Sequence, residues 1–171
     1  MRLFRDASLA LALFAVVVLG PPGRQPAYAG EALDKALQTR CTRSTCIIRD
    51  NRGGDVALYQ RAAREVLAEG KNLVIDGFCA SACVVLADLA RSRTCITLDA
   101  EIAVHKTSIM EVPADAVIGG PDLPAGRLLR RSDPPQSADI NRRVYAHGGY
   151  PSEGAMVMPV GAARSFWPLC K

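Results

Sequence analysis

The chain has 171 residues, of which 49% are hydrophobic and 22% charged, and its formal net charge is +4. This composition excludes a disordered tail, a collagen-like repeat and a multi-domain enzyme. Residues 1–29 predict a secretory signal peptide, because Arg2 and Arg5 precede a short apolar run and an A-x-A cleavage site ends at Ala29. Cleavage there leaves one domain, residues 30–171, whose small positive charge is not a nucleic-acid-binding footprint.

The apolar run of the signal peptide is shorter than the roughly 20 residues that a membrane-spanning helix needs. No comparable run follows it. We therefore expect the mature chain to be exported to the periplasm or secreted, without an integral membrane segment.

All six cysteines lie in the predicted mature chain, at Cys41, Cys46, Cys79, Cys83, Cys95 and Cys170. An even number of cysteines behind a signal peptide predicts disulfides in an oxidising compartment. The short spacing of Cys41 and Cys46 would let them close a small loop, but the spacings assign no other pair. A zinc site is disfavoured, because the chain has only two histidines and no C-x-x-C pair. We expect neither a metal nor a cofactor.

Helical and strand-like patterns alternate through the first half of the mature chain. The expected elements are a short helix at 31–38, a strand at 46–48, a helix at 55–69, a strand at 73–75, a helix that follows Ser81, and strands at 95–98 and 102–104. Strands that alternate with helices predict right-handed βαβ crossovers. The expected fold is therefore a single α/β domain with a mainly parallel sheet.

The second half of the chain is less regular. Residues 106–136 are rich in proline and glycine and predict a long loop, which in a compact domain is a lid, a binding loop or a disordered excursion. The basic segment 127–131 is expected to be a solvated part of that loop. A last helix is expected at 137–146, and the tail from 151 onward shows no readable pattern.

Three polar or flexible positions follow successive predicted strands. Gly53-Gly54 follows the first, Ser81 the second and His105 the last, so all should meet at the carboxyl edge of the sheet. A serine beside free N–H groups at a helix start and a nearby histidine base are the parts that acyl transfer needs. Taken singly, each has a structural alternative: a helix cap, a surface histidine and a glycine turn.

These residues resemble a known family. The segments Gly53-Gly54-Asp55-Val56, Cys79-Ala80-Ser81-Ala82-Cys83 and Glu101-Ile102-Ala103-Val104-His105 are similar in order and spacing to the proteolytic subunit of the Clp protease. They are more similar still to exported bacterial members of the ClpP/crotonase-like superfamily that carry a C-x-S-A-C segment. The resemblance covers about residues 47–108 and implies a ClpP/crotonase-like fold.

The resemblance also implies roles for individual residues. It makes Ser81 the nucleophile, His105 the general base, and the backbone N–H groups of Gly54 and Ala82 the oxyanion hole. No acid matches the third triad position clearly. Glu153 lies at about the expected distance in sequence, and Asp133 and Asp139 are also available.

The implied function is an exported serine hydrolase, most simply a peptidase, with a peptide or another acyl compound as substrate. The alternative is a non-catalytic periplasmic binding or envelope protein with the same fold, since this superfamily spans active and inactive members. An acyl-CoA enzyme is disfavoured, because an exported protein rarely meets that cofactor. Assembly into a homo-oligomer is left open.

Overall fold

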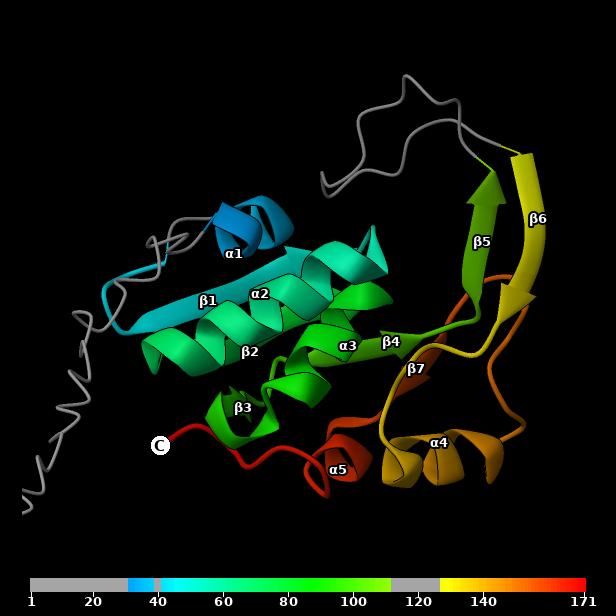
Figure 1. Ribbon diagram of the computed structural model, residues 1–171. Helices are drawn as coiled ribbons and strands as arrows, with labels where there is room; N and C mark the ends of the chain where they lie inside the picture. The colour runs from blue at the N-terminus through cyan, green and yellow to red at the C-terminus, as the bar shows by residue number, and fades with distance from the viewer. Residues whose placement is uncertain (1–30, 39–40, 112–126) are drawn as a thin grey trace, which may run out of the picture.

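A computed structural model of the chain describes residues 31–38, 41–111 and 127–171 (Figure 1). The predicted signal peptide, residues 1–29, lies outside the described residues. In the described part of the chain, no helix is long and apolar enough to cross a membrane. The chain folds as one mixed α/β domain around a mainly parallel sheet.

The larger sheet has five strands in the order β1-β2-β4-β7, with β3 also paired to β2. Its strands are β1 (Thr45–Asn51), β2 (Asn72–Ala80), β3 (Thr94–Ile96), β4 (Glu101–Val104) and β7 (Met156–Met158). The first half of β2 pairs with β3 and its second half with β4, both in parallel. Only β7 runs antiparallel, along the free side of β4. The predicted parallel α/β sheet is thereby confirmed.

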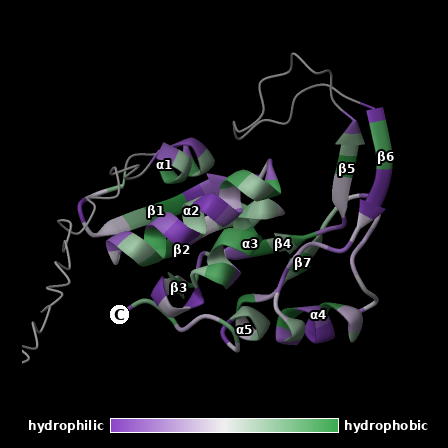
Figure 2. Cartoon of the chain, in the orientation of Figure 1, coloured by the Kyte–Doolittle hydropathy of each residue, from purple (hydrophilic) through white to green (hydrophobic). Residues whose placement is uncertain are grey.

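Five helices accompany the sheet in the described part of the chain. They are α1 (Glu31–Leu37), α2 (Val56–Glu69), α3 (Ala82–Leu89), α4 (Ala138–Tyr145) and α5 (Val160–Ala163), with a 3-10 turn at Arg91–Arg93. Helix α3 is hydrophobic on most sides (Figure 2) and all its residues except Leu89 are buried, as its apolar sequence predicts. Because α3 starts directly after β2, this buried helix fixes the position of the turn between them.

The prediction of one long loop at 106–136 is wrong in part. The structure has a hairpin there, formed by β5 (Thr107–Glu111) and β6 (Arg127–Ser132), and residues 112–126 lie outside the described part. The basic segment is therefore a solvent-exposed strand, so the prediction was right about its exposure and wrong about the loop. It was missed because β6 is exposed along almost its whole length, so it lacks the alternation of apolar and polar residues that marks a half-buried strand.

The six cysteines form three disulfides, as predicted. They join Cys41 to Cys46, Cys79 to Cys83 and Cys95 to Cys170. Three disulfides in one small domain are typical of an oxidising compartment. No cysteine is left as a thiolate ligand for a metal.

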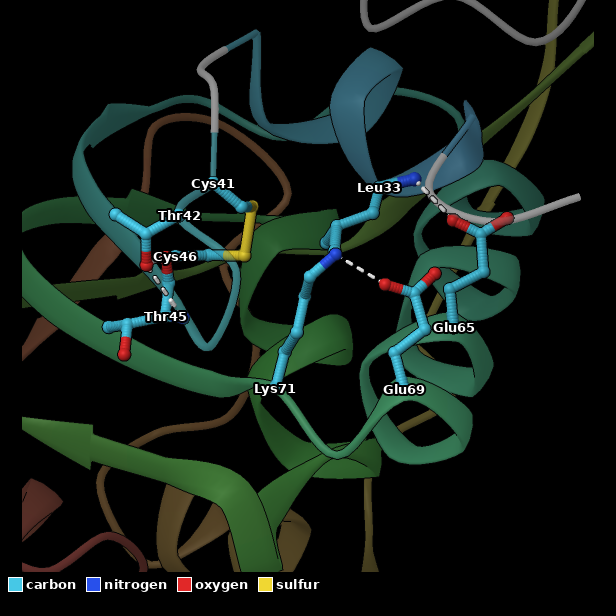
Figure 3. The surroundings of a disulfide bond; sticks show 8 residues. All are labelled: Leu33, Cys41, Thr42, Thr45, Cys46, Glu65, Glu69 and Lys71. Atoms are coloured by element: carbon cyan, nitrogen blue, oxygen red, sulfur yellow. Dashed lines mark hydrogen bonds and ion pairs between the residues drawn. A yellow bond between two sulfur atoms is a disulfide. The ribbon is translucent and has the colours of Figure 1, made fainter. Parts of the chain in front are cut away.

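The first disulfide lies where the chain enters the sheet, beneath α1 (Figure 3). Nearby, the Glu65 carboxylate of α2 accepts hydrogen bonds from the backbone N–H groups of Ala32 (3.2 Å) and Leu33 (2.8 Å). These N–H groups have no partner inside a helix, so a carboxylate there stabilises α1. Glu65 thus attaches the first helix to the second.

The C-terminal tail is attached to the core at three points. Cys170 forms a disulfide with Cys95 of β3, and Ile96 exchanges backbone hydrogen bonds of 3.0 Å with Pro168 and Cys170. The indole N–H of the fully buried Trp167 donates to the Ala87 carbonyl of α3 at 3.0 Å. A tail with no readable sequence pattern is therefore a packed part of the domain.

A cluster of charged side chains joins α3 to α4. The side chain of Asp88, only 3% exposed, accepts a hydrogen bond from the backbone N–H of Ser137 (2.6 Å) and pairs with Arg91. Arg91 also pairs with Asp139. Hydrogen bonds from Arg91 and from the Ser137 hydroxyl hold the pKa of Asp139 far below its ordinary range. The cluster closes the end of α3 that lies away from Ser81.

The low pKa of Asp139 leads to a prediction about the stability of the protein in acid. Asp139 binds its proton less readily in the folded than in the unfolded chain, so its contribution to stability is present above about pH 4 and is lost as the pH falls. We expect Asp139→Asn to be less stable than the wild type at neutral pH, and the difference to shrink as the pH falls below about 4. Urea unfolding at a series of pH values measures this. A constant difference across that range would contradict it.

Candidate functional site

The carboxyl ends of β1, β2 and β4 lie side by side. Asn51 at the end of β1 is opposite Cys79, and Ala80 at the end of β2 is opposite Ala103. The Ser81 backbone N–H donates to the Ala103 carbonyl at 3.0 Å, so the turn after β2 is hydrogen-bonded to β4. Gly53-Gly54, Ser81 and His105 therefore leave the sheet at one edge, as their order in the sequence predicts.

Ser81 has an unusual backbone conformation, with φ 57° and ψ −121°. Only one other non-glycine residue in the described part of the chain, Gln38, has a positive φ. Although Ser81 occupies the cap position of α3, its side chain forms no cap hydrogen bond. The structural alternative for this serine was a helix cap, and the geometry does not support it. Backbone strain of this kind clusters at functional sites, including the sharp strand-to-helix turns that present a nucleophile.

The Cys79–Cys83 disulfide spans the Ser81 turn. Cys79 is the second-last residue of β2 and Cys83 the second residue of α3, and both are fully buried. The covalent link therefore fixes the separation of strand and helix on either side of the serine. Because strain persists only where the surroundings impose it, this bridge and the buried α3 together account for the conformation of Ser81.

Gly53 lies directly against this turn. With φ +82°, its hydrogen atoms leave room for a close approach: a β-carbon there would lie 2.7 Å from the Ala80 oxygen and 2.8 Å from the Ser81 β-carbon. Only glycine fits such a position. The glycine pair is therefore more than a turn, because it brings a second backbone segment to Ser81.

Asn51 holds the glycine pair in place, a role that sequence reasoning missed. Its side-chain oxygen accepts from the Gly53 backbone N–H at 3.0 Å and from the Tyr59 hydroxyl at 2.7 Å, and its amide donates to the Ala36 carbonyl at 2.9 Å. The available signal was an asparagine two residues before a glycine, a pattern typical of an Asx turn.

We expect Asn51→Ala to lower the free energy of unfolding by about 2–3 kcal/mol, because it removes a buried amide and leaves its partners with fewer hydrogen bonds. The exposed Asn72→Ala is the matched control and should change stability by less than about 0.5 kcal/mol. Chemical denaturation of the two variants measures both values. Equal stability of the two would contradict the role of Asn51.

Two backbone donors near Ser81 are unused. Among the described residues, neither the Gly54 N–H nor the Ala82 N–H donates a hydrogen bond. Ala82 is the first residue of α3, where an N–H has no intrahelical partner. Backbone N–H groups without a partner in the protein are suited to stabilise negative charge on the oxygen atom of a bound group.

His105 directly follows β4 and is half-buried. Its Nδ1 lies 2.7 Å from the backbone oxygen of Lys106. Because a carbonyl only accepts hydrogen bonds, this contact requires the proton on Nδ1, which leaves Nε2 of the neutral ring free to act as a base. In serine hydrolases with a Ser-His-Asp triad, a buried carboxylate selects this tautomer. Here a backbone carbonyl does so.

The three carboxylates considered as a third triad member lie in different surroundings. Glu153 lines the same open pocket as His105, although no hydrogen bond joins the two in the described structure. Asp133 accepts a hydrogen bond from the Tyr145 hydroxyl, and Asp139 is held by Arg91. Glu153 is thus the one carboxylate of the three that shares a pocket with His105.

Comparisons with known proteins add nothing to this geometry. No model of a protein family matches the chain. No curated protein matches it. No solved structure matches it.

Proposed function

We propose that this protein is an exported serine hydrolase with a ClpP/crotonase-like fold, in which Ser81 is the nucleophile and His105 the general base. The observation that carries the proposal is the Ser81 turn: a serine with a strained backbone, which does not cap its helix, between two disulfide-bonded cysteines and beside unused N–H groups. A serine with a purely structural role needs none of these features.

The chemistry follows from the arrangement. The Ser81 hydroxyl oxygen attacks the substrate carbonyl carbon while its proton passes to Nε2 of His105. The carbonyl electron pair moves to oxygen, where the N–H groups of Gly54 and Ala82 stabilise the charge. Collapse breaks the bond to the leaving group, which takes the proton from His105. Water then attacks the acyl-serine in the same way, releasing the acid and restoring Ser81.

Peptides are the simplest substrates of such a site, because an amide offers the carbonyl and the leaving amine that it needs. His105 supplies the proton to that amine. Glu153 is the candidate for assisting His105 in the complex, since hydrogen bonds of catalytic groups are often longer before substrate binds.

Labelling with a fluorophosphonate tests the proposal, because only an activated serine displaces fluoride from phosphorus at an appreciable rate. The oxidised mature protein should be labelled at least about 10³-fold faster than Ser81→Ala or His105→Ala. His147→Ala is the matched control, since His147 is exposed and bonded to its own helix at the Arg143 carbonyl, and it should be labelled like the wild type. Absence of labelling in folded, oxidised protein would favour the non-catalytic binding role.

A further inference from the structure

A pocket of about 400 Å³ opens beside His105 and is lined by charged side chains. Its walls include His105, Lys106 and Ser108 from the start of the hairpin, Arg131 from the end of the hairpin, and Ser152 and Glu153 from the segment before β7. The Lys106 backbone N–H donates to the Pro151 carbonyl at 3.1 Å. This bond joins the hairpin to the opposite wall, so the pocket is part of the folded domain.

The arginines at the two ends of the hairpin have different surroundings. At the far end, Arg127 pairs with Glu111 across the strands at 2.8 Å. At the near end, Arg131 lies opposite the neutral Ser108. Within the described residues, the side chains of Lys106 and Arg131 form no ion pair and no hydrogen bond. Two cations that line one pocket without an internal partner are suited to bind an anionic group.

Because the pocket lies beside His105, it can be assigned to the leaving-group side of the scissile bond. In acyl transfer by a serine, the histidine base also delivers the proton to the leaving group, so the leaving group lies beside the imidazole. A pocket that includes His105 therefore receives the leaving group and what is attached to it. Glu153 adds one negative charge to the pocket, against the two positive charges of Lys106 and Arg131.

We infer that the substrates carry a carboxylate on the leaving group, which Lys106 and Arg131 bind. This inference rests on the proposed hydrolase function and names its substrate class: acyl compounds whose leaving amine, alcohol or thiol bears a free carboxylate, as the last residue of a peptide does. Lys106 and Arg131 determine specificity and take no part in the proton transfers, which follow the steps given above.

Two matched thioesters test the inference. Both have N-acetylalanine as the acyl group, and the thiol leaving group is mercaptoacetate in one and its uncharged amide in the other. Their affinities are measured by calorimetric titration of the Ser81→Ala protein, which cannot form the acyl-serine, and their turnover is measured with protein that retains Ser81. We expect the carboxylate to be preferred by about tenfold or more in both measurements.

The preference should disappear in the double variant Lys106→Gln, Arg131→Gln, and persist in Arg130→Gln. Arg130 is the neighbouring arginine of β6, lies opposite Ile109 and is not part of the pocket lining, so it controls for the loss of surface charge. Unchanged circular dichroism and melting temperature verify that the variants are folded. Added salt should weaken the preference, because it screens exposed charges.

The outcomes separate the two proposals. Ser81-dependent turnover of both thioesters at equal rates and with equal affinities would overturn the inference about the pocket and leave the hydrolase proposal intact. Preferential binding of the carboxylate without Ser81-dependent turnover would overturn the hydrolase proposal, and with it the assignment of the pocket to a leaving group. A carboxylate preference that survives in the double variant would overturn the roles of Lys106 and Arg131.

Discussion

Replacing both Cys95 and Cys170 by alanine is expected to lower the free energy of unfolding by about 4–5 kcal/mol. The reason is loop closure: this disulfide joins residues 75 positions apart, so removing it gives the unfolded chain a large gain in conformational entropy. The tail keeps its hydrogen bonds to Ile96 and Ala87, so the variant should still fold in the cold. Urea denaturation of oxidised protein measures the loss.

The matched control is the double replacement of Cys41 and Cys46. That disulfide closes a loop with a separation of only 5 residues, and its removal should cost about 2 kcal/mol. Both variants lack one disulfide, so the difference between them measures the effect of loop length. Equal losses in the two variants would contradict this account of the tail. Fluorophosphonate labelling of both should resemble that of the wild type, because neither disulfide touches the Ser81 turn.

The Gly53→Ala substitution is expected to lower both the stability of the protein and the reactivity of Ser81. The new methyl group would lie 2.7 Å from the Ala82 nitrogen and 2.8 Å from the Ser81 β-carbon, so the turn has to move, and φ +82° disfavours alanine by itself. We expect a loss of about 3 kcal/mol in the free energy of unfolding from overpacking and backbone strain. Labelling of the folded variant should slow by about 10²-fold, because the Gly54 N–H is a proposed donor to the developing oxyanion and would be displaced.

The Gly70→Ala substitution distinguishes the effect of backbone strain from that of steric contact with the Ser81 turn. Gly70 ends α2 with φ +65°, but an added β-carbon would meet nothing closer than 3.8 Å. This variant should lose about 1 kcal/mol from the unfavourable backbone conformation alone and keep the full rate of labelling. Similar labelling of the two glycine variants would show that Gly53 and its neighbour do not contribute to the reactivity of Ser81.

The elements that sequence reasoning predicted best are those with a buried face and clear ends. Helix α2 was expected at 55–69 and extends over Val56–Glu69, because Asp55 caps its start and Gly70 its end. The parallel order of β1, β2 and β4 followed from the alternation of strands and helices. Burial and capping are local properties, so a short window of sequence contains them.

The elements that were missed depend on partners distant in the chain. Strand β7 has only three residues and exists because it pairs with β4, and the tail is held by a disulfide to β3. Of the site, the position of Gly53-Gly54, Ser81 and His105 at one edge of the sheet followed from the order of the strands. The tautomer of His105 did not follow from that order, and neither did the two pocket cations that have no partner among the described residues. These features depend on hydrogen-bond geometry and on the hairpin.

The residues that flank Ser81 are suited to an exported protein. With alanines on both sides of Ser81 and a cysteine beyond each, the turn is held by a covalent bond within the chain. Such a bond needs an oxidising compartment to form. The predicted export of the chain and the architecture of the proposed nucleophile turn are therefore consistent with each other.

The central claim is that Ser81 is an activated nucleophile, and intact-mass spectrometry with peptide mapping after fluorophosphonate treatment tests it most directly. The account predicts one adduct on each oxidised chain, located on Ser81, and no adduct when Ser81 is replaced by alanine. An unmodified chain after prolonged exposure, or an adduct on another serine that persists in Ser81→Ala, would contradict the claim.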